Sequence, residues 1–254
     1  MRPYILAETN WKDIREREIE VAVLPWGATE AHNYHLPYAT DNYQIETIAA
    51  EAGKQAFEKG AKLMILPNIP FGVNTGQADI LLDINLNPST QMAILTDIVE
   101  ALNRQGIYKL ILLNGHGGNN FKPILRELGL KYPEMFLITT NFFEVTDKYK
   151  FFEEKGDHAD EMETSLMIYL RPELVSPLEE AGEGAENKSK IEGIREGWAW
   201  AERKWSLVSK DTGIGNPKKA TKEKGQKFFA EVCTKLARLF LDVSNIKIED
   251  RYER

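Results

Sequence analysis

Four short apolar runs along the chain alternate with longer amphipathic stretches. Each run is largely apolar and ends at turn residues, which is typical of strands buried on both faces. The stretches between the runs carry apolar residues at helical spacing. This alternation predicts βαβ units and an α/β fold of three layers, a three-layer αβα sandwich with helices on both faces of a mostly parallel sheet. The predicted strands are 21–25, 62–70, 109–115 and 135–141, and the predicted helices cover 42–60, 88–106, a stretch after 118, 160–170 and 222–240.

Capping residues and composition refine this picture. Ser89 is predicted to cap its helix and Gly106 to end it. We expect one domain over residues 1–254. The net charge of -7 gives no support to nucleic-acid binding, and no apolar run is long enough to span a membrane. With no signal peptide and one cysteine, Cys233, expected in the core, the sequence predicts a cytoplasmic protein without disulfides.

Chemically active side chains follow the ends of predicted strands. The segment LPWGATEAHNYHLPYATD places Glu30, His32, His35 and Asp41 after the first strand, and LLNGHGGNN places His116 after the third. In a parallel α/β sheet the ligand site lies at the carboxyl ends of the strands. A third group, His158 to Glu163, stands at the start of a predicted helix. We therefore expect these three segments to meet in one site.

Imidazole nitrogens and carboxylate oxygens are ligands for divalent zinc, manganese or iron. A carboxylate has two oxygens and can bridge two ions, and Asp41 is the best candidate for this bridge. A binuclear centre generates hydroxide at neutral pH and polarises a carbonyl, the two acts that amide hydrolysis requires. The predicted ligands are Glu30, His32, Asp41, His116 and one of the glutamates near 161–163.

The helical periodicity of 160–170 separates two glutamates. Glu163 falls within the broad apolar face, whereas Glu161 lies nearly opposite its centre. A carboxylate on a buried face needs a partner, and a metal ion would serve. We therefore predict Glu163 as the ligand and leave Glu161 as a group behind the ligands or in solvent. His158, at the start of the helix, is a candidate general acid or base, and His35 is expected to cap or pack.

Further residues are candidates for substrate contacts. Asn74 or the backbone amides of Gly117 and Gly118 are expected to orient a substrate. The glycine-rich segment 178–215 is predicted to be an irregular excursion that forms a lid or an oligomer contact. Its tryptophans either close the pocket or pack between subunits. These tryptophans are Trp198, Trp200 and Trp205.

The motifs together resemble one family. GATEAHNYHLPYATD, LLNGHGGNN, HADEMETS and TGIGNPKKATKEKG stand in the order and roughly the spacing of the creatininase (creatinine amidohydrolase) family. The resemblance implies a central parallel sheet, a binuclear metal centre, hydrolysis of a carbon–nitrogen bond in a small amide, and homo-oligomers, often hexamers. By matching position it implies that His158 contacts substrate or transfers a proton. It also implies metal-ligand roles for Glu30, His32, Asp41 and His116.

The sequence departs from the family pattern at several positions. Creatininases carry a glutamate ligand where this chain has Gly118, which fits the branch with H-G-G-N, where the glutamate of E-T-S, here Glu163, is expected to ligate. Asp160 and Asn33 replace usual glycines, and the segment after Gly72 lacks a P-G-T-like turn. Creatinine is therefore not implied as the substrate. Members of this branch resemble enzymes acting on formamidopyrimidines, cofactor-precursor peptides or cyclic inososes.

These observations favour a metal-dependent hydrolase acting on the carbon–nitrogen bond of a small amide. Two divalent ions, zinc first and manganese or iron as alternatives, would hold a hydroxide, and His158 or Glu161 would protonate the leaving nitrogen. One alternative is an isomerase, lyase or ring-opening hydrolase of a sugar-like substrate such as an inosose. A non-catalytic member of the family is another, although that would require a broken ligand set.

Overall fold

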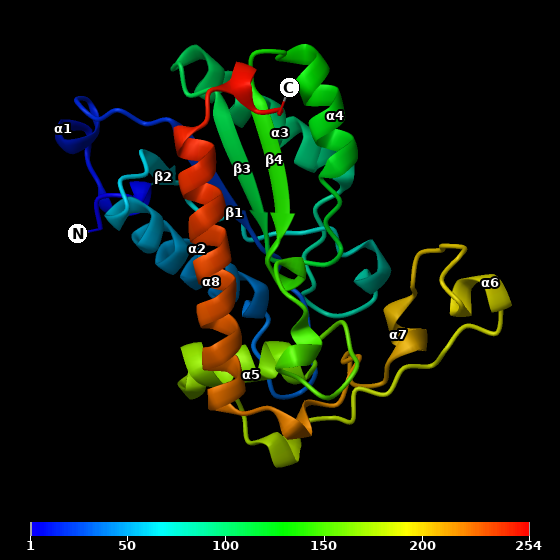
Figure 1. Ribbon diagram of the computed structural model, residues 1–254. Helices are drawn as coiled ribbons and strands as arrows, with labels where there is room; N and C mark the ends of the chain where they lie inside the picture. The colour runs from blue at the N-terminus through cyan, green and yellow to red at the C-terminus, as the bar shows by residue number, and fades with distance from the viewer. Residues whose placement is uncertain (1, 254) are drawn as a thin grey trace.

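The structure is a computed structural model and describes residues 2–253. Its central sheet has four parallel strands in the order β2-β1-β3-β4 (Figure 1). Trp26 pairs with Asn114, and Asn114 with Asn141, so three strands end together at one edge. The strands are β1 (Val21–Trp26), β2 (Leu63–Ile65), β3 (Lys109–Asn114) and β4 (Phe136–Asn141).

Helices cover both faces of the sheet, which makes the fold a three-layer α/β sandwich (Figure 1). Successive residues of β1 point to opposite layers because strand side chains alternate: Val21 and Val23 join one apolar cluster, and Ala22 and Leu24 join the other. The first layer contains α2 (Thr40–Glu58), α5 (Glu161–Leu170) and α8 (Lys222–Asn245). The second contains α3 (Pro88–Arg104) and α4 (Lys122–Lys131).

The strands and helices lie close to their predicted positions, with two local errors. The second predicted strand, 62–70, pairs regularly only over Leu63–Ile65, with an isolated bridge at Ile69. Prolines in this segment remove backbone donors and explain its early end. Ser89 does not cap α3, since the helix already begins at Pro88, a residue suited to the first helical position. Gly106 follows the end of α3 with φ of 75°, as expected of a terminating glycine.

The segment 178–215 is irregular, as predicted, and its α6 and α7 region extends away from the sheet (Figure 1). It contains only short helices, among them α6 (Glu192–Arg195) and α7 (Trp205–Val208), and a further short helix, α1 (Trp11–Ile14), lies near the N-terminus. Among residues 2–253, no helix combines the length and apolar character that a membrane crossing requires.

Candidate metal centre

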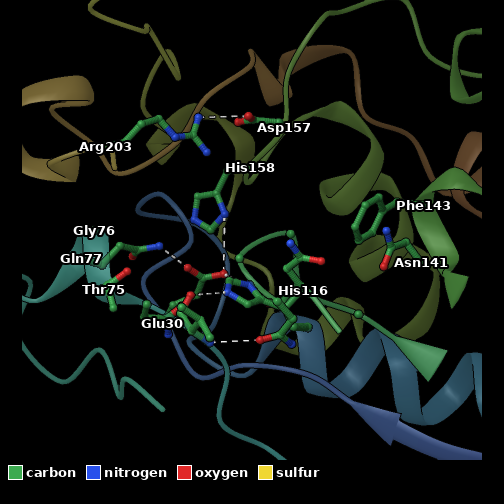
Figure 2. Close-up of a pocket in the computed structure, with 18 of the residues that line it drawn as sticks. Glu30, Thr75, Gly76, Gln77, His116, Asn141, Phe143, Asp157, His158 and Arg203 are labelled. Carbon is green, nitrogen blue, oxygen red and sulfur yellow. Dashed lines mark hydrogen bonds and ion pairs between the residues drawn. The ribbon is translucent and has the colours of Figure 1, made fainter. Parts of the chain in front are cut away.

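A pocket of about 780 Å³ lies at the carboxyl edge of the sheet. Figure 2 shows Glu30, His116 and His158 pointing toward one another in this pocket, with Gln77 on one side and Asn141 and Phe143 on the other. Glu30 follows β1, His116 follows β3, and His158 precedes α5. The three segments predicted to converge do meet here.

The first cluster of donor atoms contains Glu30, Asp41 and His116. His116 Nδ1 lies 2.8 Å from Glu30 Oε1 and 3.0 Å from Asp41 Oδ2. All three side chains are buried, and their donor atoms lie within 4.8 Å of one another. Asp41 Oδ2 is fully buried and meets no donor in hydrogen-bonding geometry among residues 2–253. This oxygen lies beside an imidazole nitrogen and a second carboxylate without a well-aligned hydrogen bond, and such a set of ligand atoms fits a divalent cation.

The second cluster contains His32, Asp41 and Glu163. His32 Nε2 lies 3.1 Å from Asp41 Oδ1 and 3.9 Å from Glu163 Oε1. Asp41 therefore presents one oxygen to each cluster, which is the arrangement of a bridging carboxylate. It occupies the first turn of α2, so the helix backbone fixes its position between the two histidines. The donor sets fit two divalent ions.

Backbone carbonyls orient His116 and His32, the histidines of the two clusters. His116 Nε2 lies 3.0 Å from the carbonyl oxygen of Val73, and His32 Nδ1 lies 3.1 Å from that of Glu30. Because a carbonyl oxygen can only accept, each of these nitrogens carries the proton when the ring is neutral, and the other nitrogen is left to bind a cation. The carbonyl atoms therefore select the imidazole tautomers that a metal requires.

His158 is held in a similar way, and its free nitrogen faces Glu30. Its Nε2 donates to the carbonyl oxygen of Ala31 at 2.7 Å, which leaves Nδ1 at 3.8 Å from Glu30 Oε1. The N–H of Ala31 in turn donates to Asp83 Oδ1 at 2.7 Å. Burial lowers the pKa of His158, so its imidazole is neutral near pH 7 and has a lone pair directed at the cluster.

Neighbouring charges and burial raise the pKa values of three groups in this centre. Burial opposes the charge on His32, but Asp41 and its neighbouring carboxylates outweigh burial and raise the pKa of His32 to about 10. In the same way Glu30 and Asp41 outweigh burial and raise the pKa of His116 well above its usual value. Burial raises the pKa of Glu163 to about 8. All three groups therefore carry a proton at pH 7.

Metal uptake at pH 7 is therefore expected to release protons. A cation needs unprotonated nitrogen and carboxylate ligands, so binding displaces the protons on His32, His116 and Glu163. The raised pKa values set the sign: affinity rises as pH increases from 6 toward 8 and falls in acid. Titration calorimetry of zinc in buffers of different ionisation enthalpy measures the released protons. An observed enthalpy that does not depend on the buffer would contradict this assignment.

Two neighbouring glycines offer a matched test of how His116 is held. A Cβ added at Gly118 would lie 2.3 Å from the carbonyl oxygen of Val73 and 2.4 Å from His116 Nε2, whereas one added at Gly117 meets nothing within 4 Å. Gly118→Ala is thus expected to displace the hydrogen bond that orients His116 and to weaken zinc binding by about 10–100-fold. Gly117→Ala should bind zinc like the parent protein. Equal zinc affinities of the two variants in a competition titration would contradict the prediction.

The other predicted site residues fall into two groups. Asn74, Gly117 and Gly118 line the pocket. Glu161 does not reach the clusters. It is fully buried, its Oε2 accepts the backbone N–H groups of Glu153 and Glu154, each at 2.8 Å, and its Oε1 accepts from Lys224 at 2.5 Å. Its carboxylate therefore holds the chain before α5, and it is not in solvent.

His35 and the tryptophans also occupy distinct places. His35 is buried and its Nε2 lies 2.9 Å from Thr164 Oγ1, as expected of a packing residue. Trp205 is buried, donates to the carbonyl oxygen of Thr212, and sets its ring against His158 with centroids 5.2 Å apart. Trp200 lines the pocket but is largely exposed. Trp198 is also largely exposed, and its ring lies next to Gly193.

Residues with unusual backbone conformations connect the irregular segment 178–215 to the site. Asn33, Ala159 and Thr212 have positive φ values, and the first two follow His32 and His158 directly. Thr212 Oγ1 accepts the N–H of Asn33 at 2.9 Å, and Asn33 Oδ1 accepts the N–H of Gly182 at 2.8 Å. Such backbone conformations persist only where surrounding contacts enforce them. Asn33, which stands where glycine is usual, therefore gains a side chain that holds the irregular segment beside His32.

Sequence patterns did not indicate Gln77, Lys148 and Arg203 near the clusters, nor the capping role of Asp160. Gln77 Nε2 donates to Glu30 Oε2, and Arg203 pairs with Asp157 at 3.0 Å beyond His158 (Figure 2). Lys148 holds Asp160 at 3.1 Å, and Asp160 caps α5 through the N–H groups of its first turn. These residues lie in loops, in short 3-10 helices or at the start of α5, where hydrophobic periodicity carries no information about direction.

The comparisons with known proteins point to one family. The model of the family described as "Creatininase: Creatinine amidohydrolase" matches residues 7–240. The chain is 27% identical over 178 residues to a 3-dehydro-scyllo-inosose hydrolase of Thermotoga maritima, with 65% of this chain and 55% of that protein covered. It is 25% identical over 194 residues to the creatinine amidohydrolase of Pseudomonas putida, with 67% and 73% covered. The chain thus spans only about half the length of the Thermotoga relative.

Solved structures support the same assignment. A Bacteroides fragilis protein named provisionally as a creatinine amidohydrolase matches all of both chains, with a TM-score of 0.93 and 42% identity. Creatininase structures described as a Zn-Zn type and as a Mn form share the fold, with TM-scores of 0.76 and 0.75 at 19% and 21% identity; each match covers 93% of this chain and 96% of the other. With its family match over nearly the whole chain, its fold and its two clusters of donor atoms, this protein belongs to the creatininase family.

Proposed function

We propose that this protein is a metal-dependent hydrolase that cleaves the carbon–nitrogen bond of a small amide or cyclic amide. One observation carries the proposal: the two oxygens of Asp41 face His32 Nε2 at 3.1 Å and His116 Nδ1 at 3.0 Å. A carboxylate placed in this way suits two divalent ions. The zinc and manganese forms of creatininase support such ions in this fold, and zinc is our first candidate.

In this proposal the chain's own residues hold the two ions and transfer the proton. Glu30, Asp41 and His116 would hold one ion, and His32, Asp41 and Glu163 the other. When bound, two such ions activate water and polarise a carbonyl. The neutral Nδ1 of His158 can accept a proton as water adds to the carbonyl carbon. It can then return that proton to the nitrogen as the C–N bond breaks, so that carbon gains OH and nitrogen gains H.

The wall of the pocket favours a small polar substrate over an apolar one. Amide and hydroxyl side chains line it beside the clusters, and the aromatic residues that line it include Trp205 and Phe143. The amide and hydroxyl residues are Asn74, Thr75, Gln77, Asn119, Asn120, Thr139, Thr140 and Asn141. The same polarity, with the inosose hydrolase relative, supports a second candidate function: ring opening of a cyclic, hydroxylated ketone. A screen that includes cyclic amides and inososes separates the two candidates by product.

The first experiment measures metal content per chain, without added metal, for the parent protein and the His116→Ala variant. We expect about two equivalents in the parent and a clear loss in the variant, as two-metal sites with shared ligands require. Hydrolysis of small lactams, formamides and cyclic ureas is then tested on the loaded enzyme. A parent protein that takes up neither zinc nor manganese would refute the proposal and leave a non-catalytic family member.

We also propose that the protein forms homo-oligomers, and the family resemblance implies a hexamer. Large apolar side chains are exposed around the irregular segment and the loop after η2 (Thr75–Gln77). They are Leu81, Leu82, Trp198, Trp200 and Leu207. Light scattering is expected to give a mass that is a multiple of 29.0 kDa. A Leu81→Asp and Trp198→Ser double variant should shift the mass toward the monomer, and a monomeric parent protein would contradict the proposal.

A further inference from the structure

The wall of the pocket beside Glu30 contains a glutamine of fixed orientation. Gln77 belongs to η2, is 4% exposed, and lines the pocket. Its Nε2 donates to Glu30 Oε2 (Figure 2). Because a carboxylate oxygen can only accept, the amide nitrogen must face Glu30. The amide oxygen of Gln77 then has no hydrogen-bond partner within residues 2–253, although it is completely buried from solvent.

Asn74 repeats this arrangement on the same wall. It is 3% exposed and lines the pocket. Its Nδ2 donates to the carbonyl oxygens of Thr29 at 3.3 Å and Ile84 at 3.2 Å, so its orientation is fixed as well. Its Oδ1 is likewise buried without a donor in the described part of the chain. Two residues that line the pocket, three positions apart, thus each have a buried acceptor oxygen without a donor in the described part of the chain.

The backing of this wall keeps both residues in place. A Cβ added at Gly76 would lie 2.2 Å from the carbonyl oxygen of Arg203, so the irregular segment packs directly on η2. Ser206 donates to Asp79 at 2.6 Å just after this turn. Neither amide can turn without giving up a hydrogen bond it already makes. An unpartnered buried acceptor is energetically unfavourable, and a donor on a ligand would remove that cost.

We propose that Asn74 and Gln77 form an acceptor pair that selects substrates with N–H or O–H donors next to the reacting carbonyl. The inference rests on the proposed function, since it takes this pocket as the substrate site. An N–H donor would come from a cyclic amide or urea, and an O–H donor from a hydroxylated ring. In either case an analogue without donors leaves both oxygens unpaired and is rejected. Gln77 also positions Glu30, whereas the side chain of Asn74 donates to Thr29 and Ile84 and, within residues 2–253, to none of the proposed ligands, which makes Asn74 the cleaner site to change.

The test uses the zinc-loaded protein and three probes: hydantoin with N–H donors, scyllo-inositol with O–H donors, and 1,3-dimethylhydantoin with none. Calorimetry is expected to show binding of at least one donor-bearing probe about tenfold or more tighter than the dimethyl analogue. Asn74→Leu should lose that preference while keeping its zinc. Gln91→Met is the matched control, because Gln91 also has a buried, unpartnered amide oxygen but does not line the pocket.

The outcomes separate this inference from the proposed function. Binding of hydantoin alone assigns the pair to N–H donors, and binding of scyllo-inositol alone assigns it to hydroxyl donors. The acceptor pair is refuted if neither donor-bearing probe binds, if the dimethyl analogue binds as tightly, or if Asn74→Leu keeps the preference. Zinc content, measured on the same samples, decides the metal centre independently. A protein that holds zinc but shows no donor preference retains the proposed function and loses only the pair.

Discussion

Replacing Asp41 by asparagine is expected to remove both metal ions and to reduce hydrolysis by at least about a thousandfold. Asparagine keeps the shape of aspartate but has only one oxygen. It therefore cannot offer a ligand oxygen to the ion beside His32 and to the ion beside His116 at the same time. A loss of both ions is therefore expected from one substitution, and mass spectrometry of the metals measures it directly.

The control for this variant lies one turn further along the same helix. Glu46 is an exposed carboxylate of α2 that belongs to neither cluster. Glu46→Gln therefore makes the same change from carboxylate to amide in the same helix as Asp41→Asn. It should retain both ions and full activity. Circular dichroism and thermal unfolding of both variants check that each has folded. An Asp41→Asn variant that keeps two tightly bound ions would rule out the bridging role.

Replacing His158 by alanine is expected to lower kcat about 10²–10⁴-fold while both ions stay bound. The Nδ1 of His158 faces Glu30 Oε1 at 3.8 Å, a distance that allows a substrate or water to be shared. Since burial lowers the pKa of His158, the parent enzyme should lose activity only in acid, below the ordinary histidine range, as the imidazole gains a proton. With zinc kept saturating at every pH, the His158→Ala variant should lack this acid limb in its dependence of kcat on pH.

His35 supplies the comparison for His158. It lies in the loop after β1 and is equally buried, but it contacts Thr164 and does not line the pocket. His35→Gln should change activity by no more than about threefold, as expected of a residue that only packs. Metal content distinguishes the remaining possibility, because Glu30, His32 and His158 also form a group of donor atoms. If His158→Ala loses an ion, His158 is a ligand and not a proton carrier.

The sequence was informative where regular elements position the side chain. Glu30 and His116 follow buried parallel strands, and such strands end at a common edge, so their meeting in one pocket could be predicted. The periodicity of α5 likewise separated Glu163 from Glu161. In the structure Glu163 lies in a cluster of donor atoms and Glu161 does not, because side chains two positions apart on a helix point about 200° apart.

The remaining features depend on long-range packing that no local pattern encodes. Glu161 was expected behind the ligands or in solvent, but Lys224 from the first turn of α8 reaches it and makes its burial possible. Gln77 and Asn74 lie on an irregular turn, where the direction of each amide is decided by Glu30, Thr29 and Ile84. The extent of the domain, the oligomer and the roles of the site residues stay predictions.

The convergence of ligands on Asp41 has a consequence for folding. Asp41 lies in the first turn of α2 and Glu163 in the first turn of α5, and the chain between them includes three of the four strands. An ion shared by these residues acts as a cross-link between distant parts of the polypeptide, closing a long loop whose closure is entropically costly. Because the cation binds the native chain in preference to the unfolded one, it draws the folding equilibrium toward the native state. In this protein the same ions would support catalysis and stabilise the fold. Removing them with a chelator would then lower the free energy of unfolding together with the activity.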